Sequence, residues 1–516
     1  MTPRLTLPLF LAFTTALGAQ SECYEDTLSN PFTADAAITG GALAADGSTL
    51  VIGRTLELDD LGDSTGAAFV FERDTSGWGS VERLLASDRS VGAQFGHAVD
   101  IDGDTLVVGA RFQESVGEIR GAAYVFERTE LGWMETARLD AVDSTAFESF
   151  AFDVAISGDR IAVGRRFYDE PGATNAGAVT IFERNLGVWT ATATLVGAPP
   201  TTDGWFGSYL DLEGDVLAVH AERQLFGGDE PVLETTVTIF RFDGLAWLLE
   251  QVYVPDDLSV ELPSMRPTLG VDRLAIANPR DGTGRVDLFE FDGSVWTADG
   301  TVTGFASEDR FGAAVDLAGD FLAVGAPVMA DGGQAFVYER ITGTWTERNT
   351  FQYPPFVGEL TRFGMGNQLA FAKGSHQLVM GTQTAEVASW SRPGLRSTYG
   401  AGTPGTNGIP SLYHEGCVGL DLPESMHISD GLELGTGLLF VSQTQAEIPF
   451  FGGTLLIGAP VFTTAPHVLD SDGNGFIPFA VNDGLVGLTF YCQAIYFDPV
   501  APELISMTNG LRLEYQ

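Results

Sequence analysis

The stretch FGHAVDIDGDTLVVGARFQESVGEIRGAAYVFERTELGW, residues 95–133, decides the fold of this chain. Two apolar runs, residues 97–102 and 105–110, flank a Gly-Asp turn in which the glycine supplies the positive φ of a hairpin. A third run, residues 122–127, is rich in strand-forming residues, and a fourth begins at Trp133. Because none of these runs has a helical period, the unit predicts four short strands joined by turns.

Further copies of this unit follow one another along the chain, some of them degenerate, and with the first stretch they make seven. Their turns lie roughly 48 to 57 residues apart, a period typical of radially repeated four-stranded sheets or of solenoids. The seven turn positions are Gly47, Gly103, Gly158, Gly214, Val271, Gly319 and Gly374.

Aromatic residues recur once per copy at equivalent places. We predict that they pack between neighbouring sheets and do not form a sugar-binding platform, because a ligand site usually breaks the symmetry of a repeat. Those that open the first strand are Phe95, Phe150, Phe206, Phe311 and Phe363. Those that open the fourth strand are Trp78, Trp133, Trp189, Trp247, Trp296 and Trp345.

The order of Phe-Gly, the turn, Val-Gly-Ala and Tyr-Val-Phe-Glu-Arg resembles the FG-GAP repeat, the propeller blade of integrin α chains and of many secreted bacterial proteins. The tandem copies cover residues 22–396. The resemblance implies an all-β chain with a seven-bladed β-propeller, an arrangement that leaves only short, protected sheet edges. The resemblance to integrin α chains also points to cell adhesion.

A different module follows the repeats. Residues 397–407 are rich in glycine, threonine and proline and read as a linker. In residues 408–516, short alternating segments predict a small β-sandwich-like module. The segments YGAGTPGTNG and IPFAVNDGLVGLTFYCQAIYFDP resemble a C-terminal module of many exported bacterial proteins, and attachment or sorting is the role we expect.

Residues 1–19 have the pattern of an export signal, with Arg4 before an apolar run and small residues at its end. We expect this signal peptide to be removed and the mature protein to be secreted or held at the cell surface. No later run reaches the roughly 18 apolar residues of a membrane helix, so we expect no membrane insertion. We expect a monomer.

The formal net charge is -42, from 27 Lys plus Arg against 69 Asp plus Glu. Such an acidic protein repels nucleic acid phosphates, so we expect no nucleic acid partner. Two interpretations of the acidity stay open. It either solvates an exported surface, or it attracts cations or a basic partner.

The three cysteines are Cys23, Cys417 and Cys492, and they allow three different single disulfides. Export makes oxidation plausible. Because Cys417 and Cys492 fall in the same C-terminal module, we predict a disulfide between them.

The two ends of the repeat region complement each other. Residues 22–28 form a strand candidate that precedes the first copy, whereas the last copy has strands at 365–372, 377–381 and 385–390 but no fourth. We predict that the N-terminal segment supplies this missing outer strand, which would close the ring and cover an unpaired edge.

The loops between the second and third strands vary most from copy to copy. In a propeller such loops gather on one face, and binding residues are often found on loops held by a rigid scaffold. The alternative is that they are ordinary solvated loops. The candidate ligand-binding residues are Arg111, Phe112, Arg165, Arg166, Phe167 and Tyr168.

The resemblance implies calcium as a candidate cofactor, because integrin-type blades bind it in an Asp-rich loop between their first two strands. Here only Asp100, Asp102 and Asp104 keep that rhythm, and the loops are too short for a cation that takes six to eight oxygens. We therefore expect no cofactor in the propeller. A better calcium candidate is the EF-hand-like segment that begins at Asp470 and lacks the acidic residue at position twelve. Its candidate metal ligands are Asp470, Asp472 and Asn474; the alternative is a simple turn.

The sequence contains no Gly-x-Ser-x-Gly, His-Glu-x-x-His or Gly-x-x-x-x-Gly-Lys motif. Acidic pairs occur, but they are expected among 69 carboxylates. We predict a non-catalytic, exported propeller that binds a protein or glycan through loops on one face, as an adhesion or surface-interaction scaffold. The alternative is a secreted hydrolase or lyase that acts on polysaccharide through carboxylates in the propeller channel.

Overall fold

The computed structural model describes residues 26–28, residues 42–352 with gaps at 75–76, 142, 144, 226–231, 255–264, 280–282, 305–309, 328–332 and 342, and, from 368 to 514, mainly the strands. The export signal predicted at residues 1–19 lies outside these residues. By its contacts the chain forms two compact units, one made by Tyr24–Ser391 and one that contains Arg392–Gln516. The described residues contain strands and no helix, so none of them forms a helix that could cross a membrane.

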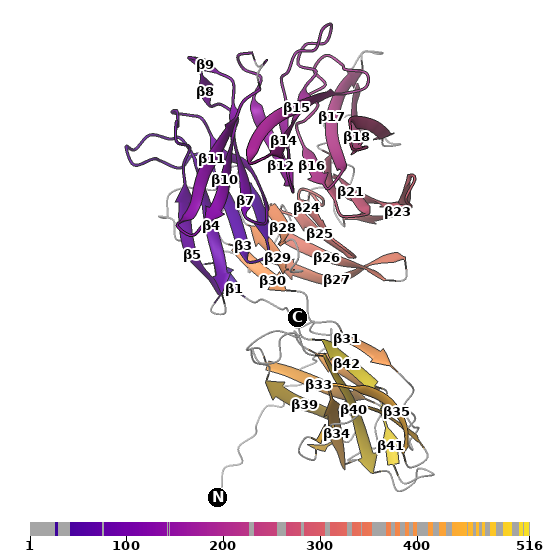
Figure 1. Ribbon diagram of the computed structural model, residues 1–516. Coiled ribbons are helices and arrows are strands. Elements are labelled where there is room, and N and C mark those ends of the chain that lie inside the picture. The colour runs from indigo at the N-terminus through magenta and orange to yellow at the C-terminus, as the bar shows by residue number, and fades with distance from the viewer. Residues whose placement is uncertain are drawn as a thin grey trace, which may run out of the picture. The chain divides into compact units, whose positions relative to one another are not determined.

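The first unit consists of seven four-stranded antiparallel sheets, named here first to seventh in chain order (Figure 1). A short hairpin of β8 (Glu114–Ser115) and β9 (Glu118–Ile119) projects from the second sheet. The sheets are formed by β2 (Leu43–Asp46), β3 (Thr49–Arg54), β4 (Ala67–Asp74) and β5 (Gly77–Leu84); β6 (Phe95–Asp102), β7 (Thr105–Ala110), β10 (Ala122–Thr129) and β11 (Gly132–Leu139); β12 (Phe150–Ser157), β13 (Arg160–Arg165), β14 (Ala178–Asn185) and β15 (Val188–Val196); β16 (Leu210–Glu213), β17 (Val216–Leu225), β18 (Val232–Phe242) and β19 (Trp247–Tyr253); β20 (Arg266–Leu269), β21 (Arg273–Asn278), β22 (Arg285–Phe291) and β23 (Trp296–Thr303); β24 (Val315–Ala318), β25 (Phe321–Ala326), β26 (Gln334–Ile341) and β27 (Thr344–Gln352); and β28 (Gln368–Ala372), β29 (Gln377–Gly381), β30 (Val387–Ser391) and β1 (Asp26–Leu28).

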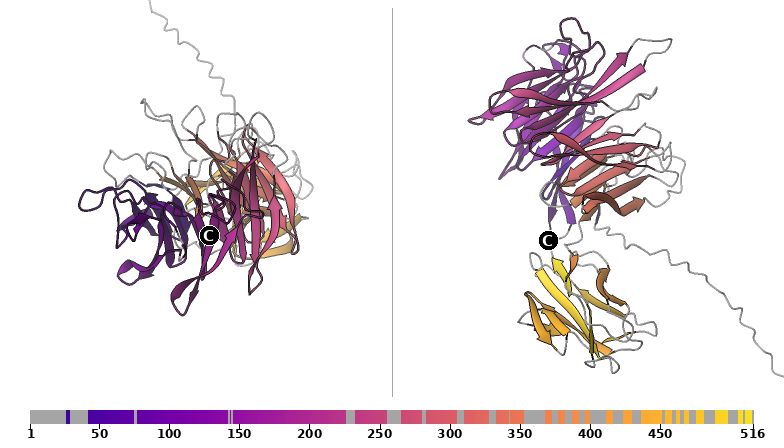
Figure 2. Two further views of the ribbon diagram at one scale, coloured as in Figure 1. Left: turned by 90° about the horizontal axis from the view of Figure 1, so that it is seen from above. Right: turned by 90° about the vertical axis from the view of Figure 1, so that its right-hand side faces the viewer.

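These sheets form a closed ring. Shared clusters of buried apolar side chains join each of the first five sheets to the next sheet along the chain. The sixth sheet reaches the seventh through a hydrogen bond from the Phe371 amide to Asp316. Ala370 and Val379 of the seventh sheet pack in one cluster with Phe71 of the first, so the two ends of the unit meet (Figure 2). The unit is therefore a β-propeller, and the all-β prediction is confirmed.

The repeated glycines set the distance between neighbouring sheets. A Cβ atom at Gly53 would lie 2.0 Å from the carbonyl oxygen of Gly96 in the next sheet. A Cβ atom at Gly164 would lie 2.1 Å from that of Gly207. Only glycine permits so close an approach of two backbones. The Val-Gly-Ala motif of one copy therefore packs against the Phe-Gly motif of the next.

The repeated aromatic residues pack as the sequence predicts. The phenylalanines that open the first strands of the second, third, fourth and sixth copies are at most 1% exposed, and Phe95 belongs to the cluster shared by the first and second sheets. Trp133 and Trp296 are also buried. Phe363 and the side chain of Trp78 lie outside the described residues.

The N-terminal strand closes the ring. β1 pairs antiparallel with β30, with Asp26 opposite Ser389 and Leu28 opposite Val387. This pairing confirms the predicted source of the missing outer strand. It involves three residues of β1, fewer than the six or so that the sequence suggests.

The second unit is also all-β. Residues 396–399, which the sequence analysis divides between the propeller and the linker, form β31 and pair with β42 of this unit. Its sheets are formed by β31 (Arg396–Tyr399), β42 (Gly510–Glu514), β40 (Thr489–Phe497), β34 (Thr436–Ser442) and β37 (Val461–Thr463), with β38 (His467–Val468) on β34 and β41 (Ile505–Met507) on β40; by β32 (Ser411–Glu415), β33 (Pro423–Ser429) and β39 (Gly475–Ala480); and by β35 (Gln445–Phe450) and β36 (Gly453–Ile457).

The predicted disulfide between Cys417 and Cys492 is wrong. Cys492 carries a free thiol, and its side chain is fully buried in β40. Burial raises the pKa of this thiol to about 12, which keeps it protonated and unreactive. Cys23 and Cys417 lie outside the described residues.

Candidate functional site

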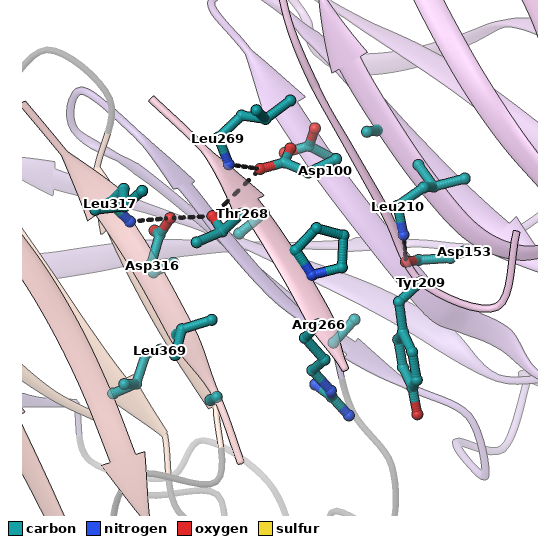
Figure 3. A pocket seen from close by; sticks show the side chains of 18 of the residues that line it. Asp100, Asp153, Tyr209, Leu210, Arg266, Thr268, Leu269, Asp316, Leu317 and Leu369 are labelled. Carbon is teal, nitrogen blue, oxygen red and sulfur yellow. Dashed lines mark hydrogen bonds between the residues drawn. The ribbon is translucent and has the colours of Figure 1, made fainter. Parts of the chain in front are cut away.

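A cavity of about 570 Å³ runs along the axis of the propeller and is lined by the innermost strand of every sheet (Figure 3). These strands are β2, β6, β12, β16, β20, β24 and β28. The cavity is the channel in which the sequence analysis placed the carboxylates of the alternative, catalytic function. Its size is typical of a small-molecule site.

Four channel carboxylates act as hydrogen-bond acceptors between neighbouring sheets. Asp100 accepts the amide of Ile101 at 2.9 Å and, from the next sheet, the amide of Ile156 at 2.7 Å. Asp153 accepts the amides of Val154 and Leu210 in the same way. We call this set the aspartate belt; it consists of Asp100, Asp153, Asp211 and Asp316.

Burial in the channel raises the pKa of Asp153 to about 7, although its two amide bonds and the charge of Arg266 act in the opposite direction. Both of its carboxylate oxygens are engaged by backbone amides. The belt therefore holds the ring together by hydrogen bonds that only the folded chain offers.

The calcium-like rhythm of the second copy has a structural explanation. Asp100 belongs to the aspartate belt, Asp102 accepts the amide of Gly158 in the next sheet, and Asp104 pairs with Arg128 at 3.1 Å. The described part of the chain holds no group of three or more His, Cys, Asp or Glu side chains that could bind a metal ion. The candidate calcium ligands Asp470, Asp472 and Asn474 lie outside it.

Arg165 is not available to a ligand, contrary to the sequence interpretation. Its side chain is fully buried and donates to Glu148 at 2.7 and 3.1 Å and to Asp143 at 2.9 Å. The ring of Tyr168 lies 4.3 Å from its guanidinium carbon. Because a buried charge must be paired, Arg165 and Glu148 form a structural ion pair. Tyr168 covers that pair.

Other predicted residues do come together. The guanidinium carbon of Arg166 lies 4.7 Å from the ring of Phe152 and 4.6 Å from that of Trp205, with Phe167 at 5.4 Å. The guanidinium carbon of Arg111 lies 4.7 Å from the ring centre of Phe112 and 5.4 Å from the ring centre of Phe152. Two arginines from the second and third sheets thus share one phenylalanine ring.

The sequence analysis missed Phe152, Trp205, Tyr209 and Arg266. Arg266 lines the cavity beside Tyr209, with its guanidinium carbon 4.6 Å from the tyrosine ring (Figure 3). These residues depart from the repeat pattern at their positions, and that departure is the signal that could have found them.

Three of these arginines lack an acidic partner. Among the described residues, no carboxylate lies within 4.0 Å of the side-chain nitrogens of Arg111, Arg166 or Arg266, whereas most other described arginines form ion pairs. Arg111 donates to Gln94 at 2.7 Å. Its pKa is lowered, first because it is partly buried and then because Arg166 lies near. We call Arg111, Arg166 and Arg266 the arginine cluster.

Two histidines lie between these arginines. Burial, together with the charges of Arg111 and Arg166, lowers the pKa of His97 to about 3. His220 is fully buried and has a pKa of about 3 for the same reasons, with Arg166 and Arg266 as its charged neighbours. Both imidazoles are therefore neutral at neutral pH, and the positive charge of this end of the channel comes from the arginines.

Comparison with known proteins supports the repeat assignment. The family model described as FG-GAP repeat matches residues 78–126, 133–182 and 301–338. No curated protein matches the chain. Among solved structures, a protein from Lactobacillus plantarum is 15% identical over 63% of this chain and 89% of its own, with a TM-score of 0.41. The Dos1 propeller is 11% identical over 69% of this chain and 93% of its own, with a TM-score of 0.40.

The family matches fall on strands of the first, second, third, fifth and sixth sheets, where the glycine and phenylalanine contacts described above join neighbouring sheets. The repeat motif and the ring of sheets thus support the same assignment. The chain thus contains a β-propeller with FG-GAP repeats.

Proposed function

We propose that this chain is an exported, non-catalytic binding protein that presents one face of its propeller to a protein or glycan. The face, called here the loop face, is formed by the loops that follow the second strand of a sheet and the loops that lead into the next sheet. In the first and second sheets these are residues 55–66, 85–94, 111–121 and 140–149.

The observation that carries this proposal is that hydrogen bonds and an ion pair join these loops to one another, while apolar side chains at the loop tips are exposed to solvent. The amide of Gly92 donates to Ser64 at 2.7 Å, that of Phe112 to Ala93 at 3.1 Å, and Arg89 pairs with Asp59 at 3.1 Å. Large apolar side chains nevertheless face solvent at the tips, namely Leu61, Val91, Val116 and Phe147.

A surface whose loops are held by hydrogen bonds to one another loses little conformational entropy when a partner binds. Exposed apolar side chains that lie together on a soluble protein are typical of interaction sites. Loops held by a rigid scaffold commonly carry binding residues. These three arguments favour a binding role for the loop face.

The arrangement of the channel favours binding over polysaccharide cleavage. General acid or base catalysis needs a carboxyl group that can reach the substrate and exchange a proton with it. In the aspartate belt both oxygens of each carboxylate accept hydrogen bonds from backbone amides. These groups therefore stabilise the contacts between neighbouring sheets.

The proposal is tested with the full chain on a glycan array and on immobilised extracellular proteins. A triple variant, Leu61→Ser, Val116→Ser and Phe147→Ser, should bind the retained ligand at least about tenfold more weakly, because apolar contact area is lost. Its melting temperature should stay unchanged, since these side chains are exposed.

The matched control is Leu186→Ser with Leu245→Ser, which removes equally exposed side chains from the turns between the third and fourth strands. This control should bind like the parent. Equal binding by the triple variant and the parent would contradict the proposal, as would a ligand that is lost in the control.

A further inference from the structure

The channel is not symmetric. The residue five positions before the turn is Ala98 in the second copy and Ala314 in the sixth. In the three copies between them it is Asp153, Tyr209 and Arg266. Small side chains thus give way to large polar ones in the third, fourth and fifth sheets. In a repeat protein such departures mark function more often than packing.

The fourth copy departs from the repeat pattern at a second position. His220 stands where most copies have the glycine of the Val-Gly-Ala motif, and its ring centre lies 5.5 Å from that of Tyr209. Neither of its ring nitrogens has a hydrogen-bond partner among the described residues. His97, from the second sheet, lies with its ring centre 5.1 Å from that of Phe152.

The arginine cluster supplies positive charge at this end of the channel. Arg166 is packed against aromatic rings, and its Nε atom is buried without a hydrogen-bond partner. Arg266 lines the cavity, and Asp153, whose pKa burial raises and the charge of Arg266 lowers, already accepts hydrogen bonds from two backbone amides. Guanidinium groups left without a carboxylate are suited to bind one from a ligand.

The net charge of the protein limits what that ligand can be. At -42, the chain repels a polymer with many anionic groups. A single anionic group is repelled far less, because salt screens the interaction between exposed charges that lie more than about 10 Å apart. The ligand that fits has one carboxylate on a compact, ring-shaped body.

We propose that the arginine cluster and the adjoining end of the channel bind a carboxylated sugar. Its carboxylate pairs with the guanidinium groups, Arg266 first, and its ring lies in the cavity against Tyr209 and Phe152, both of which line it. A cavity of about 570 Å³ accommodates one or two sugar rings. The proposal rests on the proposed function, because it names the ligand class for the same face of the propeller.

The first test is calorimetric titration of the full chain with glucuronate, with a disaccharide that ends in glucuronate, with glucose, and with an acidic dipeptide. The acidic sugars should bind at least about tenfold more tightly than glucose, because only they carry the charge that the arginines pair with. The monosaccharide and disaccharide together distinguish a free sugar acid from the end of a glycan. Equal binding of glucose, or tighter binding of the dipeptide, would overturn the proposal.

The second test uses variants. Arg166→Gln and Arg266→Gln should each weaken glucuronate binding at least about tenfold, and Arg266→Lys should restore part of it, since it keeps the charge. The control Arg184→Gln makes the same change in net charge at an arginine paired with Asp159 and Glu127, away from the cavity lining. It should bind glucuronate like the parent. The melting temperature of each variant shows whether it is folded.

These tests separate the two proposals. If the arginine variants bind the glycan-array ligand normally while the loop-tip variants do not, the sugar-acid site is excluded and the proposed function stands. If glucuronate binding needs the arginines but no macromolecular ligand is retained, the site stands and the proposed function fails.

Discussion

Two neighbouring interfaces of the propeller follow different rules. Between the third and fourth sheets, Gly164 packs against Gly207 and Phe206 is buried, as the repeat requires. Between the fourth and fifth sheets, His220 takes the place of that glycine, and Arg266 with Tyr209 lines the channel. Both interfaces contain a cluster of buried apolar side chains. At the position of the repeat glycine, however, the first interface brings backbone against backbone, whereas the second has a histidine side chain.

The sequence explains why the second interface can differ. The fifth copy has Pro263 and Ser264 where the fourth has Phe206 and Gly207. Since the incoming copy lacks the Phe-Gly pair, the preceding strand is no longer restricted to glycine, and a histidine fits. Loss of the repeat motif at one interface therefore makes room for side chains that a ligand could use.

The largest effect is expected from a substitution that breaks the first interface. Gly164→Ala should lower the free energy of unfolding by about 3 kcal/mol, because its Cβ would lie 2.1 Å from a backbone oxygen that cannot move freely. All eight tryptophans fall within the first unit, so urea unfolding followed by tryptophan fluorescence reports on the propeller.

The matched substitution at the second interface is His220→Ala. It should change the free energy of unfolding by less than about 1 kcal/mol, because the loss of ring contacts is offset by removal of two buried nitrogens without partners. Equal losses in the two variants would show that both interfaces obey the same packing rule.

A loss comparable to that of Gly164→Ala is expected where the ring closes, because β1 supplies the outer strand of the seventh sheet. Deletion of residues 20–30 removes the three residue pairs between β1 and β30. At about 0.5 to 1.5 kcal/mol for each hydrogen bond, the loss should be about 2 to 4 kcal/mol at most, and the exposed edge of β30 should promote aggregation. Size-exclusion chromatography and urea unfolding check both outcomes.

Thr27→Pro is the control for that deletion, because it removes one amide donor from β1 and leaves the chain length unchanged. It should produce part of the same loss. A truncated protein that stays monomeric and unfolds at the parental urea concentration would show that β1 contributes little to ring closure.

Acid pH should change the free energy of unfolding through the two buried histidines, His97 and His220, of the asymmetric end. Their pKa values are about 3 in the folded chain and 6.5 in the unfolded chain, so between these values the unfolded chain binds more protons. The free energy of unfolding therefore falls as the pH decreases through this window, by about 1.4 kcal/mol per pH unit for each histidine.

Asp153 acts in the opposite direction. Its pKa is about 7 in the folded chain and 3.8 in the unfolded chain, so the folded chain binds more protons between these values and becomes more stable as the pH decreases. We expect His220→Gln to reduce the acid sensitivity between pH 6.5 and 5 by about 2 kcal/mol relative to the parent. Parallel stability curves for the two proteins over that range would contradict this expectation.

The failures of the sequence interpretation have particular causes. Arg165 and Arg166 are adjacent and alike in the sequence, but Arg165 is buried against Glu148 and Arg166 lies among aromatic rings. Arg165 is the last residue of β13 and Arg166 lies in the turn that follows, and the partners of both side chains come from other parts of the chain. The disulfide failed for a similar reason, since membership of one module does not place two cysteines within bonding distance.

The sequence by itself determined the all-β propeller, its packing phenylalanines and the strand that closes its ring, because each of these follows from local patterns repeated along the chain. Only the tertiary structure decided which carboxylates bind backbone amides and which arginines lack a partner. Those properties depend on side chains about 55 residues apart meeting across neighbouring sheets, as in the bonds from Ile156 to Asp100 and from Leu210 to Asp153. A repeat pattern reports the spacing of such residues, and the charge balance between them exists only once the ring is closed.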